Sequence, residues 1–174
     1  MPTLPLTSPM VAVSDTSPLS NLAIIGRLGL VREQFSAVLV PSAVRHELSR
    51  LRQPAAASLI AAAFDDGWLR ITPLRHAVPR EIGAGLHAGE AEAIALAGEQ
   101  RADMVLLDDG DARRRASNIG LRFIGVLGIL LRARQRGRLP SLREEIRRLR
   151  EEAHFFVAPK LEAEVLAAAG ETPA

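Results

Sequence analysis

The fold is decided by the stretch Met10-Val-Ala-Val-Ser-Asp-Thr-Ser-Pro18, in which a short apolar run ends in polar and turn-forming residues. An apolar run of this length, bounded by turn residues, is typical of a buried parallel strand. Ser17 followed by Pro18 predicts a helix N-cap and a proline at the first helical position, so we expect a helix to start there. The stretch therefore predicts a strand that leads directly into a helix.

The same order of strand and helix recurs along the chain. Similar apolar runs predict strands at residues 37–40, 104–107 and 122–124, and a short one at 69–72. A loop is expected over residues 73–88, where glycines interrupt the pattern. Strands that alternate with helices predict a three-layer α/β/α sandwich around a central, mostly parallel sheet of four to five strands.

The chain has 174 residues, which fits one domain with a proper core. We expect a loose leader at residues 1–9, the main domain at residues 10–152 and a helical extension at residues 153–174. The absence of cysteine excludes disulfide bonds, cysteine-ligated zinc and a thiol nucleophile. No apolar run approaches the roughly 20 residues of a membrane span, and no basic segment precedes an apolar one at the start, so we expect a cytoplasmic protein without membrane attachment.

Positive charge is concentrated in one part of the chain and carried almost entirely by arginine. Residues 112–150 contain twelve arginines against Glu144 and Glu145, a net charge of +10, whereas the whole chain carries +2. Such a segment favours a polyanionic partner, the alternative being a solvated helix face. The only lysine is Lys160, which excludes a P-loop and a receiver-type phosphate site.

Acidic residues gather where the expected strands end. Ligands in open parallel sheets bind beyond the carboxyl ends of the strands, and the residues expected at or near that edge are Asp15, Glu47, Glu90, Glu92, Asp108 and Asp109. Several unpaired carboxylates repel one another, and a divalent cation removes that cost. Oxygen ligands without histidine or cysteine favour Mg²⁺ or Mn²⁺, and such a site suits phosphodiester hydrolysis.

Each of these residues also has a purely structural interpretation. Asp15 can cap the following helix, and Glu47 can be a solvated helix residue. Glu90 near a helix start can interact favourably with the helix dipole. The run from Asp108 to Asp111 can form a turn followed by a helix cap. Their shared placement at the ends of successive strands is what favours a common site.

Four separated segments, in this order, resemble the motifs of PIN-domain proteins. They are Val13-Ser-Asp-Thr-Ser-Pro-Leu-Ser-Asn-Leu-Ala23, Val40-Pro-Ser-Ala-Val-Arg-His-Glu-Leu48, Gly89-Glu-Ala-Glu-Ala-Ile-Ala-Leu-Ala97 and Leu106-Leu-Asp-Asp109. The resemblance spans residue 11 to about residue 136 and is to a prokaryotic branch similar to VapC-type toxins. It implies a PIN-like α/β/α fold whose acidic residues bind Mg²⁺ or Mn²⁺ and cleave RNA.

Carried over position by position, the resemblance implies a catalytic, metal-binding set made of Asp15, Glu47, Glu90 and Asp109, with Asp108 as a further ligand or a substitute for Asp109. Two positions depart from the family pattern. The third acid is usually aspartate, and here either Glu90 or Glu92 offers it. The residue two positions before the fourth acid is usually threonine or serine, and here it is Leu107.

The arginines next to this set are the expected nucleic-acid contacts. Arginine forks suit bidentate phosphate binding. We expect such contacts from Arg113, Arg114 and Arg115, directly after the expected metal-binding turn, and from Arg132 and Arg134 on a later helix. The resemblance to PIN-domain proteins implies a metal-dependent endoribonuclease that acts on RNA as the toxin of a type II toxin–antitoxin pair. It also implies an antitoxin protein as partner and a homodimeric state. The alternative is a non-catalytic PIN-like module that binds nucleic acid or protein.

Overall fold

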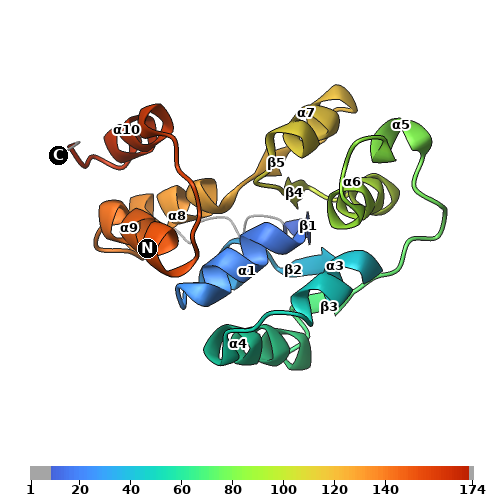
Figure 1. Cartoon of the computed structure of the whole chain (residues 1–174), viewed down its shortest axis with the longest axis horizontal. Coiled ribbons are helices and arrows are strands. Elements are labelled where there is room, and N and C mark those ends of the chain that lie inside the picture. Colours follow the sequence, from blue (N-terminus) through green and yellow to red (C-terminus); the bar gives the residue numbers. More distant parts are fainter. Residues whose placement is uncertain (1–8, 173–174) are drawn as a thin grey trace, which may run out of the picture.

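The computed structural model describes residues 9–172 and contains a five-stranded parallel sheet between layers of helices (Figure 1). The strands lie in the order β3-β2-β1-β4-β5. Their bounds are β1 (Val11–Ser14), β2 (Ala37–Val40), β3 (Leu69–Ile71), β4 (Met104–Leu106) and β5 (Phe123–Ile124). The expected three-layer α/β/α fold is confirmed. The expected leader, except for its last residue, lies outside the described residues.

Ten helices connect and cover these strands within residues 9–172. They are α1 (Thr16–Ile24), α2 (Gly29–Gln34), α3 (Ser42–Leu48), α4 (Pro54–Asp65), α5 (Arg80–Gly83), α6 (Ala88–Gln100), α7 (Gly110–Asn118), α8 (Val126–Gln135), α9 (Leu142–Glu152) and α10 (Pro159–Ala168). None of them is long and apolar enough to cross a membrane. The loop expected over residues 73–88 is interrupted by α5, a single turn whose four residues are too few for an apolar period.

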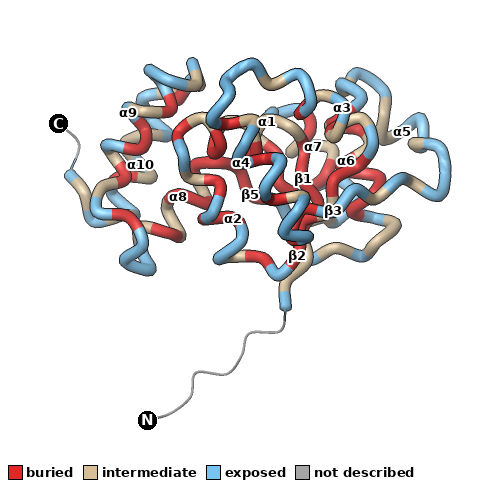
Figure 2. The backbone as a smooth tube through the Cα atoms, turned by 90° about the horizontal axis from the view of Figure 1, so that it is seen from below, coloured by how far each residue is buried: buried red, intermediate tan, exposed pale blue. Residues whose placement is uncertain are grey.

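Alternate residues of the strands build a separate core on each face of the sheet. Ala12 and Met104 belong to the larger core, together with the buried side chains of α1, α2, α4, α8 and α9. Their neighbours Val13 and Val105 belong to the smaller core, which α6 and α7 cover. Figure 2 shows this buried interior enclosed by exposed helix surfaces. The strands are apolar on both faces because both faces are covered.

Helix α1 begins two residues earlier than Ser17 and Pro18 predict. Thr16 is its first residue and Asp15 occupies the N-cap position. Pro18 is tolerated because the first turn of a helix does not use its N–H groups in intrahelical bonds. The Ser17 hydroxyl instead donates to Asp108 Oδ2 at 3.2 Å, and the Asp15 side chain makes no capping bond. The Asp15 carboxylate is therefore left to face the ends of the strands.

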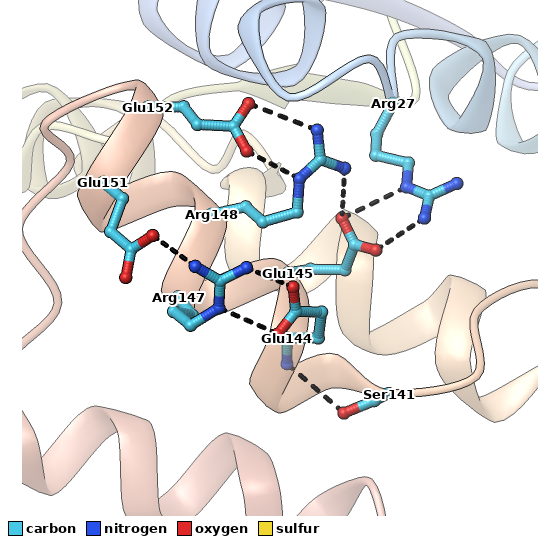
Figure 3. Close-up of polar contacts among 8 residues, drawn as sticks. All are labelled: Arg27, Ser141, Glu144, Glu145, Arg147, Arg148, Glu151 and Glu152. Carbon is cyan, nitrogen blue, oxygen red and sulfur yellow. Dashed lines mark hydrogen bonds and ion pairs between the residues drawn. The ribbon is translucent and has the colours of Figure 1, made fainter.

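An ion pair attaches α9 to the end of α1 (Figure 3). Glu145 is only 1% exposed, and its carboxylate accepts hydrogen bonds from Arg27 Nε at 3.1 Å and Nη2 at 2.7 Å. Arg148 approaches the same carboxylate at 3.6 Å. A buried carboxylate needs such partners because removing it from water is costly. The pair fixes where α9 lies on the larger core.

A second carboxylate attaches the C-terminal helix. Glu171, just after α10, accepts hydrogen bonds from the backbone N–H groups of Leu142 and Arg143 at 2.6 and 3.0 Å and from Arg134 Nε at 2.9 Å. It therefore satisfies free N–H groups in the first turn of α9 and pairs with α8 at once. Leu166 of α10 is buried against the larger core. The helix of the expected extension thus packs on the main domain.

Candidate active site

A pocket of about 390 Å³ lies at the carboxyl ends of the strands. Its lining residues are all of polar or charged types, and they are Asp15, Thr16, Ser17, Ser20, Glu47, His87 and Glu90. Asp15 follows β1, Glu47 lies on α3 after β2, and Glu90 lies in the first turn of α6. Three of the carboxylates expected from the sequence are therefore brought together, from three segments that are distant along the chain.

The backbone of Gly89, in the first turn of α6, lies directly against the carboxylates of Asp15 and Glu47. An ideal Cβ built on Gly89 would lie 2.9 Å from Asp15 Oδ1, 2.8 Å from Glu47 Oε1 and 3.1 Å from Glu47 Oε2. Real Cβ atoms almost never approach another heavy atom below 3.0 Å. Both carboxylates thus occupy space that the side chain of any larger residue at position 89 would need. The glycine at this position of α6 lets Asp15 and Glu47 approach the same point.

Asp15 is the most buried of these acids, with 6% of its surface exposed. Burial raises the pKa of its carboxyl from 3.8 to about 7, and the negative charges of Glu90, Glu47 and Asp108 contribute to the increase. None of Asp15, Glu47 and Glu90 forms an ion pair with a residue between 9 and 172. The pocket therefore holds negative charge without a compensating cation from the described chain.

Glu90 and Asp109 lie at two helix starts that face each other. Glu90 Oε2 accepts a hydrogen bond from the His87 N–H at 3.1 Å. Burial raises the pKa of Glu90, and the charges of Asp109 and Glu47 add to this. Asp109 caps α7, because its Oδ1 accepts from the N–H groups of Asp111 and Ala112 at 2.8 and 2.9 Å. Asp109 thus lies near Glu90. Its Oδ1 accepts the capping hydrogen bonds of α7, and its Oδ2 takes no part in the cap.

Asp108 is not one of the lining residues of the pocket and is held beside it in a hydrogen-bond network. Its Oδ1 accepts from the Val126 N–H at 2.8 Å and lies 3.7 Å from Arg113 Nη2. Its Oδ2 accepts from the Ser17 hydroxyl, which in turn accepts from Asn21 Nδ2 at 2.9 Å. Burial raises the pKa of Asp108. Of the two adjacent aspartates, Asp108 ties β4 to α1 and α8 and lies near enough to Asp15 to raise its pKa, and Asp109 lies near Glu90.

Glu92 has a structural contact rather than a place in the pocket lining. Its Oε2 accepts a hydrogen bond from the Ala43 N–H at 2.8 Å, in the first turn of α3. The first N–H groups of a helix have no partner within the helix, and Glu92 satisfies one of them. Because α3 carries Glu47, this bond links the position of Glu47 to α6. The structure places Glu90, not Glu92, against the pocket.

The first two of the expected nucleic-acid-binding arginines differ in how they are held. Arg113 donates from Nε to the Leu107 carbonyl at 2.9 Å, and its guanidinium lies 5.6 Å from the centre of the Phe123 ring. Arg114 is exposed and pairs with Asp111 on the surface. Arg113 is therefore part of the network behind the pocket, and Arg114 lies where a substrate can reach it.

The other three expected arginines lie elsewhere. Arg115 donates to the carbonyl oxygens of Ile82 at 2.7 Å and Ala84 at 3.0 Å, and so holds α5 and its following loop against α7. Arg134 pairs with Glu171. Arg132 lies near the end of α8. Because α8 starts at the carboxyl ends of the strands and runs back along the sheet, Arg132 lies far from the pocket.

The donor chemistry of the pocket fits a hard divalent cation. No three histidine, cysteine, aspartate or glutamate side chains within residues 9–172 are arranged as a complete metal site. Mg²⁺ does not require one, because it keeps several waters and is usually held by one or two carboxylates together with substrate phosphates. Asp15 and Glu47, adjacent and without ion pairs, supply that number of carboxylates. The residues therefore fit Mg²⁺ or Mn²⁺ rather than zinc.

Two features of the site were missed by reasoning from the sequence. The motif that contains Gly89 gives no indication that the lack of a side chain there makes room for Asp15 and Glu47. A glycine in the first turn of an otherwise alanine-rich helix was the available signal, because glycine is costly there. The contact between Glu92 and Ala43 had no signal, since it depends on how α3 and α6 pack.

A parallel sheet covered by helices, with an acidic pocket at its strand ends, defines an α/β/α protein whose pocket offers oxygen donors. A family model for the PIN domain matches residues 11–171, and the chain belongs to the PIN-domain family. The chain is also similar in fold to a solved PilT N-terminus domain protein from the hyperthermophilic archaeon Sulfolobus solfataricus P2. The similarity has a TM-score of 0.53 and 23% sequence identity, and covers 71% of this chain and 93% of that one. No curated protein matches the chain.

Proposed function

We propose that this PIN domain is an Mg²⁺- or Mn²⁺-dependent endoribonuclease that acts in the cytoplasm as the toxin of a type II toxin–antitoxin pair. The observation that carries the proposal is the meeting of Asp15, Glu47 and Glu90 in one pocket without a compensating cation from the described chain. The PIN-domain family consists in general of metal-dependent nucleases, which supports this class of reaction.

Asp15 and Glu47 are the proposed metal ligands. Glu90 and the carboxylate oxygen of Asp109 that does not cap α7 add further negative charge beside them. Thr16 Oγ1 donates to Glu47 Oε2 at 2.5 Å, which fixes how that carboxylate is turned. A divalent cation held there would lower the pKa of a water molecule and stabilise the charge that develops on the phosphate. Asp15 must be deprotonated to serve as a ligand, so cation binding releases its proton.

Arg114 is the proposed phosphate contact next to this pocket. Its partner Asp111 and its own guanidinium are both exposed. Surface ion pairs of this kind contribute little stability, so the guanidinium can exchange Asp111 for a phosphate group at small cost. Arg113 and Arg115 are proposed to act indirectly, by holding Asp108 and the segment after α5.

The test is cleavage of total cellular RNA by the purified protein, with Mn²⁺ and with EDTA, followed by mapping of the fragment ends. We expect cleavage only with Mn²⁺. Asp15→Asn is expected to abolish it while the circular dichroism spectrum and cooperative melting are retained. Metal-dependent cleavage by a folded Asp15→Asn protein would show that the acidic pocket is not the active site.

The competing outcome is a non-catalytic module. It predicts intact RNA in the same assay and no heat of Mn²⁺ binding by isothermal titration. The toxin role is tested separately, by co-expression with the product of the adjacent gene. We expect the two proteins to co-purify and the nuclease activity to be suppressed. Light scattering tests the proposed homodimer.

A further inference from the structure

Most arginines of the basic segment are held by other parts of the protein. Nine of the twelve between residues 112 and 150 make ion pairs or hydrogen bonds through their guanidinium groups: Arg113, Arg114, Arg115, Arg134, Arg138, Arg143, Arg147, Arg148 and Arg150. Figure 3 shows two of them, Arg147 and Arg148, between glutamates of α9. The local excess of positive charge is therefore largely neutralised within the fold.

The remaining three arginines, Arg122, Arg132 and Arg136, make no such contact with residues 9–172. They lie together. Ile124 of β5 packs against Gly128 of α8, where an added Cβ would lie 2.6 Å from the Ile124 side chain. Arg122 shares the face of Ile124, two residues before it, and Arg132 shares the face of Gly128, one helical turn after it.

Arg136 lies one further turn along and extends this group. Together with Ser36 and Met10, it lines a surface hollow of about 370 Å³. Ser36 directly precedes β2 and Met10 directly precedes β1. The hollow, and the cluster beside it, therefore lie at the amino ends of the strands, at the edge of the sheet opposite the carboxylate pocket.

The three guanidinium groups influence one another. Burial lowers the pKa of Arg132, and the charges of Arg136 and Arg122 lower it further. Arginine stays protonated under all ordinary conditions, so the repulsion among these three like charges lowers the stability of the folded protein. An anion bound between them removes that cost, and arginine forks bind phosphate oxygens in a bidentate manner.

We propose that Arg122, Arg132 and Arg136 form a second RNA-binding site, which holds the phosphate backbone at the edge of the sheet opposite the carboxylate pocket. The proposal rests on the proposed RNA substrate. An acidic pocket repels phosphates until a cation is bound, so affinity for RNA must come from cationic groups elsewhere. Of the three arginines that follow Asp109 most closely, Arg113 and Arg115 are engaged within the protein, which leaves Arg114 as the one proposed phosphate contact beside the pocket.

The test measures binding of a fluorescein-labelled single-stranded RNA by anisotropy in EDTA, where neither the metal nor cleavage takes part. Arg122 and Arg136 are the exposed members of the cluster, so the double variant Arg122→Gln/Arg136→Gln should fold. Losing two phosphate contacts should flatten the slope of log K against log salt by about 1.4 and weaken binding by roughly 25-fold at about 0.1 M salt.

The matched control is Arg147→Gln/Arg150→Gln, which removes the same charge from two exposed arginines that are paired with glutamates. We expect its salt slope to stay close to that of the wild type. An unchanged slope in the cluster variant would overturn the proposal, and it is the result expected if the cluster serves a protein partner. An equal change in the control variant would overturn the proposal as well. Failure of the cleavage assay would overturn the proposed activity alone, because this binding assay does not depend on it.

Discussion

Gly89 shows how a single missing side chain makes the site. Glycine in a helix ordinarily costs up to about 1 kcal/mol relative to alanine, so Gly89→Ala would normally stabilise α6. Here the new methyl group meets Asp15 Oδ1 and Glu47 Oε1 below 3.0 Å. We expect Gly89→Ala to push the two carboxylates apart and to weaken Mn²⁺ binding by at least tenfold, measured by isothermal titration.

Gly98 of the same helix supplies the control. An added Cβ at Gly98 meets no heavy atom within 4 Å. Gly98→Ala should therefore leave Mn²⁺ affinity unchanged and raise the free energy of unfolding by up to about 1 kcal/mol. Equal Mn²⁺ affinity in the two variants would show that the contacts of Gly89 do not matter for the metal.

The raised pKa of Asp15 predicts that the metal-free protein loses stability as pH rises. Its pKa is raised from 3.8 to about 7 in the fold, so the folded state binds the proton more tightly than the unfolded state does. The free energy of unfolding should therefore fall, relative to Asp15→Asn, between about pH 4 and pH 7. Asp15→Asn should be the more stable protein at pH 7.5, by an amount on the order of a few kcal/mol.

Urea denaturation of both proteins in EDTA at several pH values checks this expectation. Parallel curves of stability against pH for the wild type and Asp15→Asn would contradict it. The same titration explains why Mn²⁺ affinity should rise with pH up to about 7, since the metal competes with the Asp15 proton.

At the level of elements, Glu92 holds α3 in the position that brings Glu47 to the pocket. Glu92→Ala removes the acceptor for the Ala43 N–H, which we expect to cost about 1 kcal/mol of stability. Because α3 carries Glu47, Mn²⁺ affinity should fall as well. Glu92→Gln keeps an acceptor oxygen and should restore most of the affinity.

Glu99 offers a control on the same helix. It accepts hydrogen bonds from the N–H groups of Arg75 and His76 at 3.0 and 3.1 Å, far from the pocket. Glu99→Ala should lose similar stability and keep its Mn²⁺ affinity. If both variants lose affinity equally, Glu92 acts through general stability and not by positioning α3.

Glu171 should control the attachment of α10. Burial alone would raise the pKa of Glu171, but the N–H groups of Leu142 and Arg143, with Arg134, lower it to about 2. Its stabilising contribution should therefore be fully present above about pH 4.5 and be lost as pH falls through about 2. At pH 7, Glu171→Ala should cost about 2 kcal/mol.

Limited proteolysis should then cut before α10 in Glu171→Ala at pH 7 and spare the wild type. Glu164→Ala is the comparison, since Glu164 is exposed and lies 4.0 Å from Lys160. Equal cutting of both variants would mean that Glu171 does not hold the helix. The stabilities of the wild type and Glu171→Ala should converge as the pH approaches 2.

The elements were predictable where local signals agree. The runs at residues 37–40 and 104–107 contain strands because continuous apolar runs of that length suit a sheet covered on both faces. The start of α1 was predicted two residues late, because Ser17 satisfies the N-cap preference as well as Asp15 does. Helix α5 was missed because one turn has no period to detect.

The site was predictable only in part. The strand-end rule brings Asp15, Glu47 and Glu90 to one pocket without any knowledge of side-chain contacts. The arginines follow no such rule. Arg115 reaches carbonyl groups more than thirty residues earlier in the chain, and Arg134 reaches Glu171. Such partners depend on how helices pack, which composition and spacing do not reveal.

For the whole molecule, the metal should act as a stabilising ligand. A ligand at about 100 times its Kd raises the free energy of unfolding by about 2.7 kcal/mol, which corresponds to roughly 5–10 °C in Tm for a protein of this size. Mn²⁺ should therefore raise the melting temperature of the wild type at pH 7.5. It should leave Asp15→Asn unchanged, and an equal shift in both proteins would point to metal binding away from the pocket.

The central position of β1 has a consequence for how the protein folds. β1 pairs with β2 on one side and with β4 on the other, yet β2 is complete at Val40 and β4 begins only at Met104. During synthesis one edge of β1 stays open until β4 arrives, and open strand edges invite pairing with other chains. Asp15 and Glu47 come from the early half, Glu90 and Asp109 from the late half. The acidic pocket is therefore assembled in two stages, and a nascent chain carries an incomplete pocket until α6 and β4 have docked.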